Sequence, residues 1–173
     1  VAHYVQKDTR LDHAAKSRAT SVYLPHTVLP MLPPRLADDL CSLRANVDRL
    51  AMVIEMQLNA DGEVIQSDAH EAVIRVIENL AYEDAIGDNR FDQMFKLAKM
   101  WQADEVKLNI SNAEMRPRIL PNQDIKVVVK WPTDATRMIE SFMVATNACV
   151  GNILGKAGAP LPWRCHAPPD TAE

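Results

Sequence analysis

Residues 11–52 read LDHAAKSRATSVYLPHTVLPMLPPRLADDLCSLRANVDRLAM, and this stretch carries the densest structural signals of the chain. A short helix is predicted over Leu11 to Ala19. Four prolines follow within ten residues, and proline removes a backbone donor, so 24–34 is expected to be a long, ordered loop. Because proline is tolerated at the first positions of a helix, a helical turn is expected from Arg35 to Leu43.

A β-hairpin is predicted next. Arg49 to Leu58 has the β-branched and Met/Leu content of a half-buried strand, and Asn59 to Gly62 supplies turn chemistry before Glu63 to Ile65 resumes the strand pattern. Val73 to Ile77 is expected to continue as strand. Residues 1–5, VAHYV, have the character of the end of a strand.

The second half mixes helices with short strands. Apolar residues at three- and four-residue spacing predict helices over Tyr82 to Ile86 and Arg90 to Ala103. A long helix is predicted over Thr133 to Ala157, with Thr133 or Asp134 as the N-cap and Gly158 as the terminator. Strands are predicted at 106–110, 118–120 and 125–129. The fold class is therefore expected to be α+β, a mixed or antiparallel sheet packed with helices.

Composition bounds the function. With 173 residues, 47% apolar and 24% charged, the chain is long enough for one globular domain, and no apolar run is long enough to span a bilayer. The short apolar runs predict no membrane association, and three scattered cysteines suit reduced thiols and predict a cytoplasmic protein. The formal net charge of -4 provides no global positive field, so charge alone argues against an RNA binder.

Familiar catalytic motifs are absent from the sequence. There is no GxSxG nucleophile elbow, no HExxH zinc motif and no glycine-rich phosphate loop. Asp38-Asp39 could bind a cation, although paired surface aspartates are common. Tyr23, next to a proline-rich loop, could stack on a base, although such a tyrosine more often serves packing.

Several motifs within residues 11–52 together indicate a protein family. VYLP, PMLPPRL and DDLCSLRAN keep their spacing within residues 11–52, and this stretch resembles the ribonuclease II and ribonuclease R (RNB-domain) family of exoribonucleases. HEAVIRVIENLAYED at 70–84 is similar to the family's strand and turn after the hairpin. RMIESFMVATNACVG at 137–151 is similar to its long helix, and WRCH at 163–166 to the segment that follows.

The resemblance implies an activity and a domain. Family members hydrolyse single-stranded RNA from the 3′ end and release nucleoside 5′-monophosphates, using Mg²⁺ held by an aspartate cluster. Those aspartates are expected upstream of Val1, so residues 1–173 are interpreted as a partial catalytic domain that lacks the aspartate motif and the C-terminal part. No metal ligand or catalytic residue is assigned within the chain, and the fragment alone is expected to be inactive.

Three RNA-binding residues carry over by resemblance. Tyr23 in SVYLP matches the tyrosine that stacks on a terminal base, and Tyr82 and Glu140 match positions around the ribose. The family's second stacking aromatic is expected near 108–110, where Leu108, Asn109 and Ile110 stand instead. Lys16, Arg18, Arg35, Arg44 and Arg49 are the local candidates for phosphate contacts, although each also fits an ordinary solvated charge.

Two alternatives stay open. The chain could belong to a truncated or degenerate relative that binds RNA or a protein partner without catalysis. The missing aspartates, and the lack of an aromatic residue at 108–110, suggest this alternative. It could also be a structural domain of this fold in which Tyr23 and Glu140 serve only packing.

Overall fold

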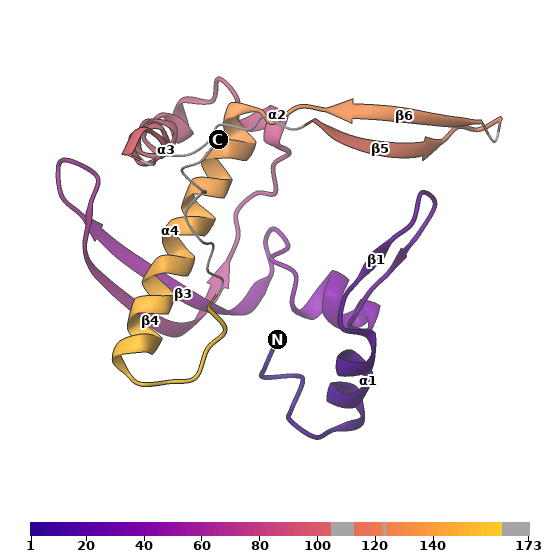
Figure 1. The fold of residues 1–173 in the computed structure, drawn as a ribbon, viewed down its shortest axis with the longest axis horizontal. Coiled ribbons are helices and arrows are strands. Elements are labelled where there is room, and N and C mark those ends of the chain that lie inside the picture. Colours follow the sequence, from indigo (N-terminus) through magenta and orange to yellow (C-terminus); the bar gives the residue numbers. More distant parts are fainter. Residues whose placement is uncertain (105–112, 123, 164–173) are drawn as a thin grey trace, which may run out of the picture.

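The computed structural model describes residues 1–104, 113–122 and 124–163 (Figure 1). Its α-helices are α1 (Arg10–Arg18), α2 (Tyr82–Ala85), α3 (Asp92–Asp104) and α4 (Asp134–Lys156). Its strands pair antiparallel as β1 (Val22–Tyr23) with β2 (Val28–Leu29), β3 (Asp48–Leu58) with β4 (Val64–Arg75), and β5 (Glu114–Ile119) with β6 (Ile125–Lys130). A π-helical turn, η1 (Arg35–Leu40), and a 3₁₀ turn, η2 (Asn89–Phe91), complete the described elements, and the α+β prediction is confirmed.

The β3–β4 hairpin is the longest pairing, and its turn forms as predicted. The Asn59 side-chain oxygen accepts hydrogen bonds from the backbone N–H groups of Asp61 at 3.0 Å and Glu63 at 2.8 Å. Gly62 has φ +81°, a left-handed conformation that side chains disfavour. Strand β4 runs without a break from Val64 to Arg75, so the pairing is more extensive than the two short predicted segments.

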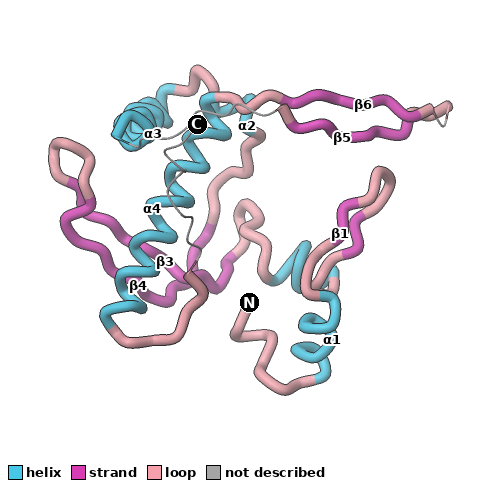
Figure 2. The backbone as a smooth tube through the Cα atoms, viewed as in Figure 1, coloured by secondary structure: helices cyan, strands magenta, loops and turns pink. Residues whose placement is uncertain are grey.

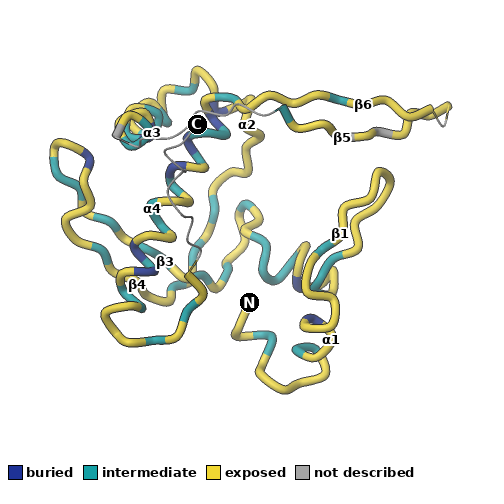
Figure 3. The backbone as a smooth tube through the Cα atoms, in the orientation of Figure 1, coloured by how far each residue is buried: buried dark blue, intermediate teal, exposed yellow. Residues whose placement is uncertain are grey.

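Helix α4 organises the packing in Figure 1, where it lies across the β3–β4 hairpin with α3 beside one end. Thr133 caps it by accepting a hydrogen bond from Thr136 N–H at 3.3 Å, and Gly158, with φ +65°, follows its end, as predicted. Figure 3 shows buried positions spaced along α4, which packs against α3 and the β3–β4 hairpin. Trp101 of α3 packs edge-on against Phe142, with ring centroids 5.1 Å apart.

The structure corrects several local predictions. Residues 1–5 form a turn, because the N–H groups of Tyr4 and Val5 both donate to the Val1 carbonyl. The proline-rich loop contains a strand at Val28–Leu29, and the turn after it ends at Leu40 instead of Leu43.

The later elements also differ at their boundaries. The strand predicted at 118–120 begins earlier, at Glu114, and Asn89–Phe91 is a 3₁₀ turn that precedes α3. The strand predicted at 106–110 lies outside the described residues.

The chain forms two groups of elements in Figure 2. One contains α1, the β1–β2 hairpin and η1, and the other contains the β3–β4 hairpin with the remaining helices. Between them, Ala45 and Val76 form an isolated parallel bridge, and the Asn79 amide bonds to the backbone of Leu43 and Ala45 at 2.9 and 2.7 Å. No helix in the described part of the chain is long and apolar enough to cross a membrane.

Candidate nucleic-acid interface

Tyr23 lies on a short, well-braced hairpin. It pairs with Val28, and the next residue, Leu24, donates its N–H to the Thr27 carbonyl at 2.9 Å. The Ser21 hydroxyl accepts from Met31 N–H at 2.9 Å, which closes the base of the hairpin. Tyr23 itself is 78% exposed, so its ring is presented to solvent and is not packed into a core of this chain.

A cavity of about 740 Å³ opens beside Tyr23. Tyr23, Leu24 and Pro25 line one side, and residues of the β5–β6 hairpin line the other: Glu114, Met115, Pro117, Val128 and Lys130. The two hairpins are about ninety positions apart in sequence, and Figure 1 shows the tip of β1–β2 directed toward β5–β6. The sequence signals for this second wall were a short strand predicted at 118–120 and a compact β run at 125–129, and neither indicated that the hairpin would face Tyr23.

Tyr82 is the first residue of α2 and is 48% exposed. The preceding N–H, of Ala81, donates to the Asp84 carboxylate at 3.0 Å, which fixes the start of the helix. Helix α2 packs against α4, the helix that carries Glu140. Glu140 is exposed, and its carboxylate forms no hydrogen bond or ion pair with any described residue.

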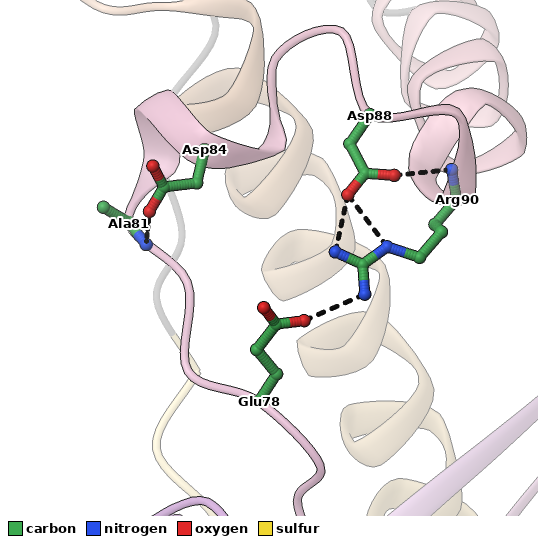
Figure 4. Close-up of polar contacts among 5 residues, drawn as sticks. All are labelled: Glu78, Ala81, Asp84, Asp88 and Arg90. Atoms are coloured by element: carbon green, nitrogen blue, oxygen red, sulfur yellow. Dashed lines mark hydrogen bonds and ion pairs between the residues drawn. The ribbon is translucent and has the colours of Figure 1, made fainter.

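An ion-pair cluster closes the loop that carries Tyr82 (Figure 4). The Arg90 guanidinium donates to Glu78 Oε2 at 2.8 Å and to Asp88 Oδ2 at 2.6 Å through Nη2. These hydrogen bonds hold the pKa of the Asp88 carboxyl below its ordinary value and raise the pKa of Arg90. Residues 78 and 90 are thereby held together on either side of α2.

The structure thus brings Tyr82 and Glu140 onto packed elements, while Tyr23 lies on the other group of elements. Within the described ranges, none of the three side chains bonds to another. Tyr23 has a cavity beside it that Tyr82 and Glu140 do not line.

Most of the five predicted phosphate-contacting cations are already engaged. Lys16 pairs with Asp12 at 2.7 Å, and Arg18 donates to the Pro30 carbonyl at 3.1 Å. Arg49, whose side chain is only 11% exposed, pairs with Asp39 at 2.6 Å, and Arg44 lies 3.5 Å from the same carboxylate oxygen. Arg35 alone of the five makes no side-chain bond to another described residue.

The described residues contain no grouped set of three candidate metal ligands. Asp39, one of the two aspartates considered for cation binding, is engaged by two arginines. In residues 1–104, 113–122 and 124–163, no three His, Cys, Asp or Glu side chains are grouped to hold a metal ion.

Comparisons with known proteins place the chain in a family. The profile of the RNB domain matches residues 1–173. Ribonuclease R of Thermotoga maritima is 33% identical over 98% of this chain, and that of Mycoplasmopsis pulmonis is 32% identical over 98%. These matches cover 27% and 26% of the two relatives, so the chain spans about a quarter of their length.

Solved structures agree. The apo form of Mycoplasma genitalium RNase R superimposes with a TM-score of 0.85 at 28% identity, over 95% of this chain and 29% of that one. The same enzyme in complex with ribose-methylated single-stranded RNA gives 0.86 at 28% identity, over 96% and 29%. Yeast Ssd1, a pseudonuclease, shares the fold alone, with a TM-score of 0.68 at 16% identity, over 91% and 21%. The match along the whole chain and the shared fold show that this protein belongs to the RNB domain family, the family of ribonuclease R.

Proposed function

We propose that this chain is part of the catalytic domain of a hydrolytic exoribonuclease that degrades single-stranded RNA from its 3′ end. The observation that carries the proposal is the 78% exposed Tyr23 beside a cavity in an RNB domain. An exposed aromatic ring offers a stacking surface to any base. The solved RNase R that this chain resembles has been captured with single-stranded and with double-stranded RNA, which supports RNA as the ligand class.

The proposed reaction is hydrolysis of the last phosphodiester bond. Water adds to the phosphorus, the bond to the 3′ oxygen of the preceding nucleotide breaks, and that oxygen takes up a proton. The released product keeps its phosphate as a nucleoside 5′-monophosphate. Mg²⁺ bound to carboxylates would activate the water and neutralise the developing charge, and those carboxylates are expected in the longer protein, upstream of Val1.

Within this chain, the proposed contributions are binding contacts. Tyr23 stacks on a base near the 3′ end, while Tyr82 and Glu140 contact ribose hydroxyls, which distinguish RNA from DNA. Glu140 suits this role because its carboxylate is exposed and has no partner among the described residues.

The test uses the full-length gene product with a 5′-labelled single-stranded RNA. We expect a ladder of products that shortens from the 3′ end. Release of mononucleotides is expected to stop when a chelator is added. Products that accumulate from the 5′ end, or cleavage that persists in chelator, would contradict the proposal. A DNA oligonucleotide of the same sequence serves as the control and is expected to remain intact.

A second candidate function is RNA binding without catalysis. No carboxylate cluster is grouped among the described residues, as both functions would require of this part of the chain. The same experiment separates the two, because a non-catalytic relative would bind the labelled RNA but leave it full length in the presence of Mg²⁺.

A further inference from the structure

We propose that Arg90 is a positioning residue for sugar recognition: by bridging Glu78 and Asp88, it holds the loop of residues 78–90 in the shape that presents the Tyr82 hydroxyl to a ribose. This inference rests on the proposed function, in which Tyr82 contacts ribose hydroxyls. It deepens that function by naming a residue on which the choice of RNA over DNA depends. Arg90 touches no substrate in this role and acts through Tyr82.

Helix α2 is too short to hold Tyr82 by itself. It has four residues, whereas isolated helices shorter than about 12 residues are marginal in water. Its start is fixed by the Asp84 carboxylate, which accepts from Ala81 N–H at 3.0 Å, a bond that spans three positions. Its last residue, Ala85, is 8% exposed, and the helix packs against α4. The orientation of Tyr82 therefore depends on how the two ends of the loop are held.

The first end of the loop is anchored to a neighbouring segment. The Asn79 amide donates to the Leu43 carbonyl at 2.9 Å and accepts from Ala45 N–H at 2.7 Å. Asn79 lies three positions before Tyr82. The chain therefore enters α2 from a fixed point.

The second end of the loop is closed by Arg90. After α2 the chain turns at Gly87, where φ is +84° and an added Cβ would meet no atom of the described residues within 4 Å. There is thus open space beside this turn. Arg90 Nη1 donates to Glu78 Oε2 at 2.8 Å across twelve positions, which brings the end of the loop back to its beginning (Figure 4).

The guanidinium group of Arg90 has a fixed geometry. Its Nε and Nη2 both donate to Asp88 Oδ2, at 2.8 and 2.6 Å, while Nη1 donates to Glu78. Its central carbon lies 5.5 Å from the centroid of the Phe91 ring. A single surface ion pair contributes little, but a planar arginine that bridges two carboxylates forms a network with few alternative arrangements. The hydrogen bonds from Arg90 also lower the pKa of the Asp88 carboxyl, so this partner is ionised at neutral pH.

These bonds distinguish positioning from a direct contact with phosphate. A phosphate that bound Arg90 would have to replace carboxylates that already lie within 2.8 Å of the guanidinium. Loss of a phosphate contact lowers the slope of log affinity against log salt by about 0.7 for single-stranded nucleic acid. Loss of a positioning residue leaves this slope unchanged and reduces the preference for ribose.

The experiment compares RNA with DNA on the full-length protein. Fluorescence anisotropy measures binding of a 5′-fluorescein oligouridylate and of the oligodeoxyuridylate of the same length, in chelator so that the RNA stays intact. The measured quantity is the ratio of the RNA affinity to the DNA affinity, because partial unfolding lowers both affinities equally and leaves their ratio unchanged. Thermal unfolding of each variant confirms that it is folded.

Arg90→Gln is expected to lower this ratio about fivefold, the size of one net hydrogen bond, at an unchanged salt slope. Glu78→Ala removes the same bridge from its other end and is expected to lower the ratio to a similar extent. Arg75→Gln is the matched control, because it breaks an exposed arginine–aspartate pair on the β3–β4 hairpin, and it is expected to leave the ratio unchanged. Equal ratios in Arg90→Gln and Arg75→Gln would overturn the proposal.

A double-mutant cycle tests whether Arg90 acts through Tyr82. Tyr82→Phe removes only the hydroxyl group. If Arg90 positions that hydroxyl, the effect of Arg90→Gln on the ratio disappears in the Tyr82→Phe background. An equal effect of Arg90→Gln in both backgrounds, or a salt slope lowered by about 0.7, would overturn the positioning role.

Failure of this inference is distinguishable from failure of the proposed function. A wild-type protein that prefers RNA and degrades it from the 3′ end, while Arg90→Gln is silent, refutes only the role of Arg90. A wild-type protein that binds RNA and DNA equally refutes the ribose contact of Tyr82 together with this inference. A wild-type protein that binds neither oligonucleotide refutes the proposed function itself.

Discussion

Tyr23 is positioned by backbone hydrogen bonds that do not involve its own side chain. The braced hairpin holds Cα in place, and the ring is left in solvent, so a substitution of the ring should change binding more than folding. We expect Tyr23→Ala in the full-length protein to weaken single-stranded RNA binding by about 1–3 kcal/mol, the usual contribution of one base–aromatic stack.

Tyr23→Phe serves as the control for that prediction, since it keeps the ring and removes only the hydroxyl. Fluorescence anisotropy at constant salt measures both variants. Equal losses in Tyr23→Phe and Tyr23→Ala would indicate a hydrogen bond of the hydroxyl and not stacking.

Asp88 makes stability depend on pH. Its pKa is depressed in the folded state, first by the hydrogen bond from the Arg90 side chain and then by the Arg90 backbone N–H. A carboxyl group whose pKa is lower in the folded state stabilises the fold at pH values above its unfolded pKa of about 3.9. This contribution disappears as the pH falls through the lower, folded-state pKa. We expect the difference in unfolding free energy between wild type and Asp88→Asn to shrink from pH 6 to pH 2.5 in urea titrations.

Asp48 gives a second, independent carboxylate of the same kind, because its bond from Arg75 at 2.6 Å also lowers its pKa. Asp48→Asn should show the same dependence on pH. A difference for Asp88→Asn that stays constant across this range would mean that its pairing with Arg90 does not persist in solution.

At the scale of elements, the cluster of Arg90 with Glu78 and Asp88 closes the loop that carries α2 and Tyr82. We expect Arg90→Gln to accelerate backbone hydrogen exchange severalfold in residues 78–90, because the loop loses its closure. Arg75→Gln, which breaks an exposed pair on the β3–β4 hairpin, is the matched control and should leave 78–90 unchanged. Equal exchange in both variants would contradict a role for Arg90 in ordering this loop.

Gly62 joins two elements, since its carbonyl accepts from Trp101 Nε1 at 2.7 Å. A Cβ at Gly62 would lie 3.2 Å from Leu97 Cδ1, whereas one at Gly87 would meet no atom of the described residues within 4 Å, although both residues have φ above +80°. Gly62→Ala and Gly87→Ala should each lower the free energy of unfolding by about 1–2 kcal/mol, because alanine disfavours the left-handed backbone conformation at both positions. We expect a further loss of unfolding free energy, measured in urea, only for Gly62→Ala, because its Cβ would press on Leu97 of α3. Equal losses for the two variants would show that α3 moves aside without cost.

Some of the individual elements could be predicted from the sequence, and others could not. The β3–β4 turn and the α4 caps were predictable because Asn59, Gly62, Thr133 and Gly158 act on their own neighbours through local bonds and backbone conformation. The strand at Val28–Leu29 was missed because proline density suggested a loop, and the pairing partner Val22–Tyr23 lies on the other side of the turn. The π-helical form of η1 has no sequence signature that periodicity detects.

At the scale of the molecule, the β3–β4 hairpin keeps an apolar surface uncovered. Leu50, Met52 and Val73 are 50%, 62% and 65% exposed and line a cavity of about 570 Å³ together with residues 1–3. The ribonuclease R relatives extend well beyond the aligned region. We expect residues 1–173 alone to bind a hydrophobic dye more strongly than the full-length protein, because other segments cover this face there. Equal dye binding, compared per mole at the same pH, would contradict that cover.

The sequence by itself determined the family, the α+β class, the place and turn of the long hairpin, and the extent of the long helix. Those features follow from residue identity, from the 3.6 and 2 periodicities, and from caps and turns that act over a few positions. It also selected Tyr23 as a candidate base-stacking residue through its place in SVYLP.

Only the tertiary structure decided what Tyr23 faces and which charges are available. The β5–β6 hairpin lines the Tyr23 cavity from about ninety positions away, and no local pattern encodes a contact over that separation. Four of the five candidate cations are engaged by acidic or carbonyl oxygens, while Lys130, which did not stand out in the sequence, lies at the cavity wall with no ion pair to any described residue. The physical reason is that a charge is available to a ligand only if folding brings no opposite partner to it, and folding is a property of the whole chain.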